Sequence, residues 1–300
     1  MALRCGLRVA SFATSDNRCA VGAPSIPRAD SHVNEPTSIA LPPGTFRRSV
    51  FAETHDTTVR AQVEDNYHHF EILMETEKGR VSALKPRAIR TPWSLCPQAA
   101  SQLDELIGMK IGTNVYRRSG MPDPRQHCTH LYELALFAMA QAARGGHRRY
   151  DIAVPDREGR VNLPFMSADG RILTRGPVVD GHTFAELRLN GKKMLEWEIV
   201  DESVVAPARF AGQNLRSLPA WAAAVFDDDT LEAIKQLRRG VHISGGRIVP
   251  LDIITRAEQH PPQMGGCYVF QTHRVQAARR NVGSTFEVNE NSELLKPGAT

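Results

Sequence analysis

The residues with the most evident chemistry lie at the start of one apolar stretch. His127, Cys128 and His130 bring two imidazoles and a thiol together within four residues, and an almost unbroken apolar run follows from residue 131 to residue 143. A run of this length behind a polar start is typical of a helix packed into a core. Imidazole nitrogen and thiolate sulfur are ligands that zinc and iron prefer. The segment therefore predicts a helix that carries candidate metal ligands at its first turn.

A second cysteine has a similar setting. Cys96 follows Ser94, which can cap a helix, and precedes Pro97, which suits a first helical turn. Apolar residues then recur at helical spacing up to Gly108, which closes the stretch. Free N–H groups and partial positive charge at a helix start favour the thiolate, the form that binds metal or attacks carbon. We expect Cys96 and Cys128 each to begin a helix.

A carboxylate and a further imidazole precede one of the expected strands. Asp65 and His68 stand just before the alternating stretch 70–75. One carboxylate, one imidazole and two thiolates would complete a tetrahedral shell. The sequence predicts a mononuclear zinc or iron site with these ligands: Asp65, His68, Cys96 and Cys128, with His127 or His130 as the alternative imidazole.

Each of these residues also has a structural explanation. A cysteine at a helix start is more often a small buried hydrophobe than a ligand, and His130 can satisfy a core carbonyl. No two cysteines here have the CxxC spacing of a common metal motif. Cys267, in a Gly-Gly-Cys-Tyr stretch, can return to the site, but an ordinary strand cysteine is the commoner case. The hypothesis therefore depends on the arrangement of the residues and on no single one of them.

We expect β-strands in the segment that precedes the two cysteine-initiated helices. Alternating residues at 59–63 and 70–75, the turn at 77–80 and the stretch 81–84 predict an antiparallel meander, whose last strand runs out at Pro92. The second half shows hairpin turns at 156–159, 169–170 and 190–191, with strands at 183–189 and 193–200. Helices are expected at 218–226 and 230–238. Asp228 or Asp229 would cap the latter, and Gly240 would close it.

These elements predict an α+β fold. Residues 45–280 form a single domain, in which 45–146 make a meander with two packed helices and 147–280 add a second β-rich layer with terminal helices. Residues 1–44 are rich in Ser, Pro and Arg without periodicity, so we expect a disordered leader, and 281–300 read as a loose tail.

Composition excludes several classes. The net charge of +4 is spread along the chain, and no aromatic residues interleave with the short basic clusters, so we expect solvated surface and no nucleic-acid partner. Five scattered cysteines suit a reducing cytoplasm better than a disulfide framework, and no apolar run reaches the length of a signal peptide or a membrane span. The chain also lacks GxGxxG, a phosphate loop and GxSxG.

Two resemblances follow from these motifs. Residues 57–144 are similar in element order to the iron–sulfur scaffold proteins of the SufE/NifU-like fold. That resemblance implies roles for Asp65, Cys96 and the His127–Cys128 pair, although the family's first cysteine falls near Val63. The phrases RTPWSLCPQA and CTHL resemble a bacterial family of unknown function over most of residues 46–275. Neither resemblance names a reaction.

The favoured function is a metal-dependent enzyme of small-molecule metabolism. A metal with one open position can polarise a carbonyl or generate hydroxide, which suits lyase or hydrolase chemistry. Arg90 and Trp93 would orient an anionic or aromatic substrate, and His130 would complete the catalytic group. The alternative is an iron–sulfur scaffold or sulfur acceptor, in which Cys128 would take persulfide sulfur. A protein with inert buried cysteines is the third possibility.

Overall fold

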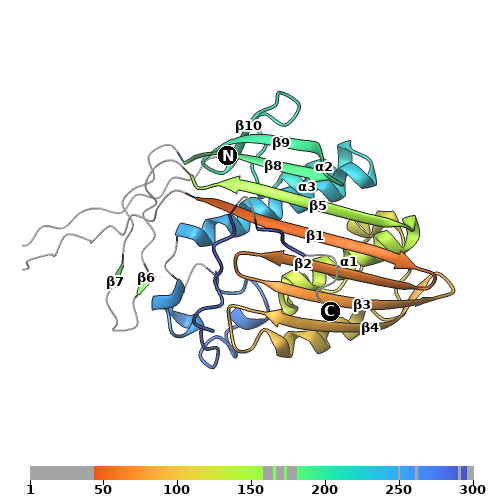
Figure 1. Ribbon diagram of the computed structural model, residues 1–300, viewed down its shortest axis with the longest axis horizontal. Helices are drawn as coiled ribbons and strands as arrows, with labels where there is room; N and C mark the ends of the chain where they lie inside the picture. The colour runs from red at the N-terminus through yellow and green to blue at the C-terminus, as the bar shows by residue number, and fades with distance from the viewer. Residues whose placement is uncertain are drawn as a thin grey trace, which may run out of the picture. The chain divides into compact units, whose positions relative to one another are not determined.

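One antiparallel sheet organises the chain. The computed structural model describes residues 44–157, 165–166, 172–173, 181–248, 251–260, 263–289 and 292–295. Within these residues, eight strands pair in the order β10-β9-β8-β5-β1-β2-β3-β4 (Figure 1). Their bounds are Thr45–His55 for β1, Thr58–Asp65 for β2, His69–Glu77 for β3, Arg80–Arg90 for β4, His147–Pro155 for β5, His182–Leu189 for β8, Lys192–Val200 for β9 and Ser203–Ala206 for β10. A separate short pair joins β6 (Phe165–Met166) to β7 (Ile172–Leu173).

Alternation of side chains gives the sheet one apolar face. In β2, Val59, Ala61 and Val63 are fully buried, while the residues between them are partly exposed. Successive side chains of a strand point to opposite faces, so Asp65 continues the buried row. β1 pairs with β2 in a register that sets Arg48 opposite Asp65. Two charged residues therefore share the face that carries the core.

The helices cover this apolar face. Figure 1 shows α1 behind β2 and β3, with α2 and α3 behind the other half of the sheet. Their bounds are Thr129–Arg144 for α1, Leu218–Val225 for α2 and Asp228–Ser244 for α3, and a long 3₁₀ helix, η1, spans Pro97–Leu106. Shorter 3₁₀ turns are η2 (Thr113–Arg117), η3 (Pro124–Gln126), η4 (Gly245–Ile248), η5 (Leu251–Ile253), η6 (Ala257–Gln259) and η8 (Tyr268–Phe270).

Both expected cysteine-initiated helices are present. Cys96 is the residue before η1, and Cys128 is the residue before α1. α1 ends at Gly145, whose φ of 76° is the left-handed conformation that glycine adopts at little cost. The apolar run from residue 131 is almost wholly buried, as its composition predicts.

The α+β class is confirmed, but the expected second β-rich layer is wrong. β5 pairs with the free edge of β1, and β8, β9 and β10 continue the same sheet beyond it. Buried and partly exposed residues alternate along β5. This pattern suits a single sheet that helices cover on one face, because only that face needs apolar side chains. The two halves of the chain therefore share one core.

The last helix is longer than expected. Its cap is Asp227, whose side chain accepts a hydrogen bond from the Thr230 amide, and the helix runs past Gly240 to Ser244. A Cβ at position 240 would lie 2.6 Å from Ile152 Cγ2 on β5. Gly240 therefore permits close packing of α3 on the sheet and does not end the helix.

The segment after residue 281 differs from the expected loose tail. Phe286 N donates to Asn66 O at 2.7 Å, and Leu295 N donates to Glu64 Oε2 at 3.1 Å. Glu64 neighbours the buried Asp65 in β2, so its side chain lies on the face opposite the helices. The described part of this segment is thus hydrogen-bonded to β2 and to the turn that follows it. Of the expected leader, Gly44 alone is described; residues 1–43, the turn at 169–170 and the end of the turn at 156–159 lie outside the described residues.

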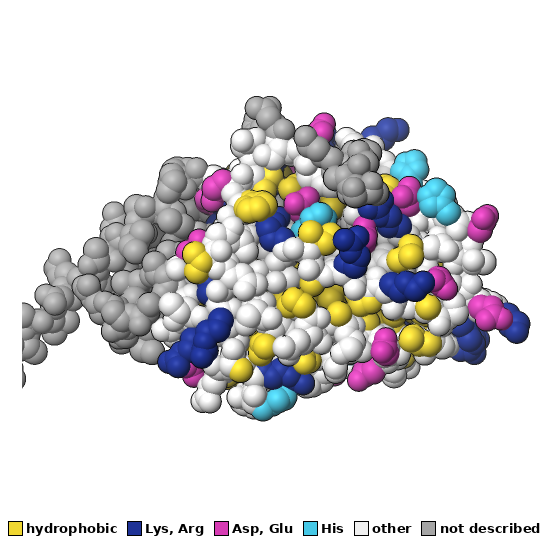
Figure 2. Space-filling model, turned by 60° about the horizontal axis from the view of Figure 1, so that its bottom comes forward, with side chains coloured by type: hydrophobic (Ala, Val, Ile, Leu, Met, Phe, Trp, Pro, Cys, Tyr) yellow, Lys and Arg dark blue, Asp and Glu magenta, His cyan; other side chains and the backbone are white. Residues whose placement is uncertain are grey.

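The surface carries charges of both signs. Figure 2 shows Lys and Arg interspersed with Asp and Glu, and apolar side chains in small separate groups. The expectation that the short basic clusters are solvated surface is wrong in part, because Arg48, Arg148 and Arg280 are buried. In the described residues, no helix has the length and apolar character needed to span a membrane.

Candidate metal centre

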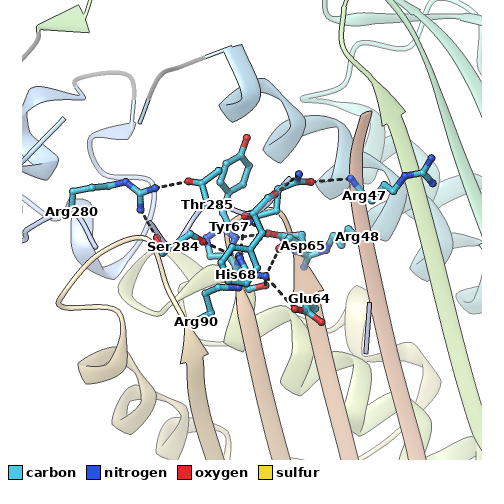
Figure 3. Close-up of polar contacts among 12 residues, drawn as sticks. Arg47, Arg48, Glu64, Asp65, Tyr67, His68, Arg90, Arg280, Ser284 and Thr285 are labelled. Carbon is cyan, nitrogen blue, oxygen red and sulfur yellow. Dashed lines mark hydrogen bonds and ion pairs between the residues drawn. The ribbon is translucent and has the colours of Figure 1, made fainter. Parts of the chain in front are cut away.

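The turn between β2 and β3 is built on the side chain of Asp65. Its Oδ1 atom accepts hydrogen bonds from the amides of Tyr67 and His68, each at 2.9 Å, and its own amide donates to His68 O at 2.9 Å (Figure 3). Aspartate favours such turns because its short side chain can bond to amides two and three residues ahead. These contacts fix the carboxylate at one end of the sheet.

Arg48 completes the surroundings of this carboxylate. Its Nη1 atom lies 2.5 Å from Asp65 Oδ2, and both side chains are almost completely buried. Burial alone would raise the pKa of Asp65, but the charge and hydrogen bond of His68, followed by the charge of Arg48, hold that pKa far below its usual range. Asp65 is therefore ionised at neutral pH. Arg48 Nε is buried and has no hydrogen-bond partner among the described residues.

His68 is oriented by the same carboxylate. Its Nδ1 lies 2.9 Å from Asp65 Oδ1, so Nδ1–H donates to the carboxylate, and in the neutral ring the lone pair is on Nε2. None of the described residues bonds to this Nε2, and 11% of the side chain is exposed. His68 thus offers a nitrogen ligand, or a base, in a largely buried position.

His130 meets His68 from the first turn of α1. The two rings are stacked, with centroids 3.8 Å apart and planes inclined by 27°. Burial, then the charges of His68 and Arg48, place the pKa of His130 well below its usual value, so the ring is neutral. Its Nε2 is buried and has no hydrogen-bond partner among the described residues. A buried polar atom without a protein partner calls for an explanation, and a bound water or ion is one.

Asp65, His68 and His130 form a buried group that could bind a metal. In the described residues they are the three side chains whose ligand atoms all lie within 4.8 Å of one another. The Asp65–His68 hydrogen bond also matches the carboxylate that commonly orients a metal-ligating imidazole through its other nitrogen. Two members of the predicted ligand set, Asp65 and His68, are thus brought together, and His130 is the imidazole beside them.

The structure does not place Cys96 and Cys128 in this group. Burial, then the negative charge that Cys128 and Cys267 would carry, raises the pKa of Cys96 well above its usual value. Burial raises the pKa of Cys128 to about 12, although the amides of Leu131 and His130 favour its thiolate. The helix starts are as expected, but burial outweighs their effect on the thiols. Both cysteines are protonated at neutral pH.

The alternative imidazole, His127, lies elsewhere. It is fully buried, and its ring centroid is 5.0 Å from that of Tyr132. Its Nε2 is 3.3 Å from Glu105 Oε2, without the alignment of a hydrogen bond. His127 is therefore close to His130 in sequence but does not join its group.

Arg90 and Trp93 support the local structure. Arg90 donates to the carbonyl oxygens of Asp65 at 2.7 Å and Asn66 at 3.0 Å, and its guanidinium lies 4.1 Å from the ring centroid of Phe286 (Figure 3). Trp93 is buried against Phe270, with ring centroids 5.6 Å apart. Both residues position the turn and the C-terminal segment in this structure.

Arg48 is the residue that the sequence reasoning missed. It falls in the alternating row of Phe46, Val50 and Ala52, all of which are buried on the helix-covered face. A charge on the apolar face of a strand requires a buried partner. A charged residue within this apolar row could therefore have identified Arg48 from the sequence.

Comparison with known proteins places a domain on this part of the chain. Residues 46–144 match the model of a family described as a protein of unknown function (DUF2889). The segment therefore is a DUF2889 domain, and it contains Arg48, Asp65, His68 and His130. No curated protein matches the chain. The comparisons give no support to the expected resemblance to the SufE/NifU-like fold, and the matched segment ends before Cys267.

Proposed function

We propose that this protein is a metal-dependent enzyme acting on a small organic substrate, with zinc or iron held at Asp65, His68 and His130. The hydrogen bond from His68 Nδ1 to Asp65 carries the proposal, because in the neutral ring it places the His68 lone pair on Nε2. This ring stacks on that of His130, whose Nε2 is buried without a hydrogen-bond partner among the described residues. Hydrolase or lyase chemistry follows from this ligand type, since an ion there polarises a carbonyl or lowers the pKa of bound water.

The residues around the ligands have defined roles. Besides offering a carboxylate oxygen to the ion, Asp65 orients the His68 ring through a hydrogen bond to Nδ1, as carboxylates next to metal-binding histidines commonly do. Arg48 keeps Asp65 ionised and in place from the adjacent strand. Arg90 holds the backbone of the turn, so it acts as a positioning residue and not as a contact for substrate.

Ion binding has a structural consequence for the two rings. The lone pair of an imidazole nitrogen lies in the plane of its ring, so two stacked rings cannot both direct a lone pair at one ion. One ring must therefore turn about its side-chain bonds when the ion binds. The neutral state of His130 makes this possible, because no proton has to be removed from its accepting nitrogen.

The competing hypothesis, a sulfur acceptor or cluster scaffold, is less consistent with the burial of Cys128. Transfer of persulfide sulfur between proteins requires an accessible thiol, and Cys128 is only 6% exposed. The burial of Cys128 therefore counts against the sulfur acceptor.

A zinc titration of metal-free protein tests the proposal. The unchanged chain is compared with His68→Gln, His130→Gln and His55→Gln, since the His55 side chain is 74% exposed and serves as the control. We expect His68→Gln and His130→Gln to lose one zinc equivalent that the control retains. Equal zinc binding by all four proteins would refute the proposal, and a brown chromophore after anaerobic reconstitution with iron and sulfide would favour the scaffold.

A further inference from the structure

A hollow lies between η2, α2 and α3. α3 packs against both of the other elements, and residues of all three line a volume of about 580 Å³. Ligand sites in proteins commonly have volumes of about 300–1,000 Å³. Leu218 and Ala222 of α2 are buried in the core, so the alanines at 220, 223 and 224 lie on the side of this helix that lines the hollow. Their small side chains leave the hollow open and make this wall apolar.

Lys235 brings a positive charge to the hollow from α3. Its Nζ lies 5.4 Å from the centroid of the Tyr116 ring, which also lines the hollow, and an aromatic face of this kind attracts an ammonium group. Lys235 is half-buried, and it makes no hydrogen bond and no ion pair with the described residues. A half-buried ammonium without a carboxylate partner is a favourable contact for an anion.

The carboxylate that acts on Lys235 already has a partner. Burial lowers the pKa of Lys235, the charge of Glu133 opposes this shift, and the charges of neighbouring arginines add to it. Both carboxylate oxygens of Glu133 accept hydrogen bonds from Arg239. The charge of Lys235 is therefore not balanced by a carboxylate of its own, and a bound anion would supply one.

Arg117, the other cation in the hollow, is fully occupied. Its Nε donates to Asp228 Oδ1 at 2.6 Å, and its two Nη atoms donate to the carbonyl oxygens of Ala223 and Phe226. These bonds hold the C-terminal end of α2 against η2, so the walls of the hollow are formed before any ligand arrives. Lys235 is the cation that remains for a ligand.

We propose that this hollow binds a small organic monocarboxylate, whose carboxylate pairs with the Lys235 ammonium and whose apolar body contacts the alanines of α2. One unpaired cation beside small apolar side chains suits a molecule with one negative charge and an apolar body. The hollow contains none of Asp65, His68 and His130, so this inference is independent of the proposed function.

Benzoate is the probe, because it combines one carboxylate with a flat apolar ring. Benzyl alcohol carries the ring without the charge, and acetate carries the charge without the ring. The full chain is titrated with each compound at constant ionic strength, while NMR follows the methyl groups of Ala220 and Ala223 and the Nζ of Lys235. We expect benzoate to saturate these signals in the millimolar range and to bind at least about 10-fold more tightly than either comparison compound. The pKa of Lys235 should rise when benzoate binds.

Two sets of variants localise the carboxylate. Lys235→Met removes the charge but keeps an unbranched side chain, and it should weaken benzoate at least about 10-fold, as expected for loss of a hydrogen bond to a charged group. Lys85→Met is the control, because Lys85 is 61% exposed on β4. Ala224→Glu should also weaken benzoate, since a carboxylate in the hollow competes for Lys235, whereas the equally large Ala224→Gln should bind more tightly than Ala224→Glu. Position 224 is exposed, so this pair keeps the test decisive if Lys235→Met does not fold.

Four outcomes would overturn the inference. They are equal binding of benzoate and benzyl alcohol, equal binding of benzoate and acetate, unchanged benzoate affinity in folded Lys235→Met, and equal benzoate affinity in the two Ala224 variants. Benzoate binding that is lost in His130→Gln would place the anion at the candidate metal centre. Absence of benzoate binding, together with reductive trapping of benzaldehyde on Lys235 by cyanoborohydride, would replace the anion site by a reactive neutral amine.

Discussion

The imidazole of His68 stacks on that of His130 with ring centroids 3.8 Å apart. His68 comes from the turn between β2 and β3, and His130 comes from the first turn of α1. The contact therefore joins the sheet to the helix that covers it, at the point where Arg48 and Asp65 form a buried ion pair. Stability and the proposed function depend here on the same few side chains.

The ion pair between Arg48 and Asp65 predicts a large effect for Asp65→Asn. Asparagine keeps an oxygen for the amides of Tyr67 and His68 but leaves the Arg48 guanidinium buried without a counter-charge. Breaking a buried pair from one side costs about 3–5 kcal/mol. Urea denaturation should show a loss of this size in the free energy of unfolding.

An exposed pair supplies the comparison. Lys85 Nζ lies 2.5 Å from Glu75 Oε1, and both side chains are largely exposed. Glu75→Gln should therefore cost no more than about 1 kcal/mol. Equal losses in Asp65→Asn and Glu75→Gln would contradict the structural role given to Asp65.

The low pKa of His130 predicts a pH dependence of stability. At a pH between the folded-state pKa of His130 and the ordinary histidine pKa near 6.5, residue 130 is protonated in the unfolded chain but not in the folded protein. Stability contributed by the neutral ring is therefore complete above about pH 6.5 and is lost as pH falls.

His130→Gln should remove that contribution. In metal-free protein, the slope of unfolding free energy against pH below about 6.5 should decrease by up to about 1.4 kcal/mol per pH unit, the value for one proton. Burial also lowers the pKa of His242, to about 4. Its contribution to the pH dependence of the unfolding free energy is the same in the variant and in the unchanged chain. Parallel stability curves for the variant and the unchanged chain would show that His130 is not held neutral.

The close approach of α3 to β5 predicts the effect of Gly240→Ala. The added Cβ would meet Ile152 Cγ2 at 2.6 Å, and overpacking of this kind costs about 1–3 kcal/mol. Gly245→Ala is the control, because that position has no atom within 4 Å and a φ of −56°. It should be neutral or slightly stabilising. Thermal unfolding of both variants tests the packing, and an equally stable Gly240→Ala would contradict it.

Local features of the fold were predictable from the sequence. The apolar run from Leu131 specified α1, and Asn190-Gly191 specified a hairpin whose residues have φ of 47° and 79°. Strand order was not predictable in this way. β5 pairs with β1 across about a hundred residues, and periodicity within β5 carries no information about which edge it joins.

The candidate site was predictable to a similar extent. Asp65 and His68 are three residues apart, so their contact follows from local turn chemistry. The partners that come from distant segments, Arg48 for Asp65 and His130 for His68, depend on tertiary packing. Arg48 was detectable as a charge in an apolar row, whereas the sequence did not distinguish His130 from His127 as the imidazole at this site.

The imidazole nitrogens themselves test the central claim most directly. Long-range ¹H–¹⁵N NMR of the histidine rings during a zinc titration should show metal-induced shifts at Nε2 of His68 and Nε2 of His130. His68 Nδ1 should remain protonated against Asp65, and the ring-current shifts of the 3.8 Å stack should be lost. The claim would be contradicted if both Nε2 signals stayed unchanged with zinc bound to the protein.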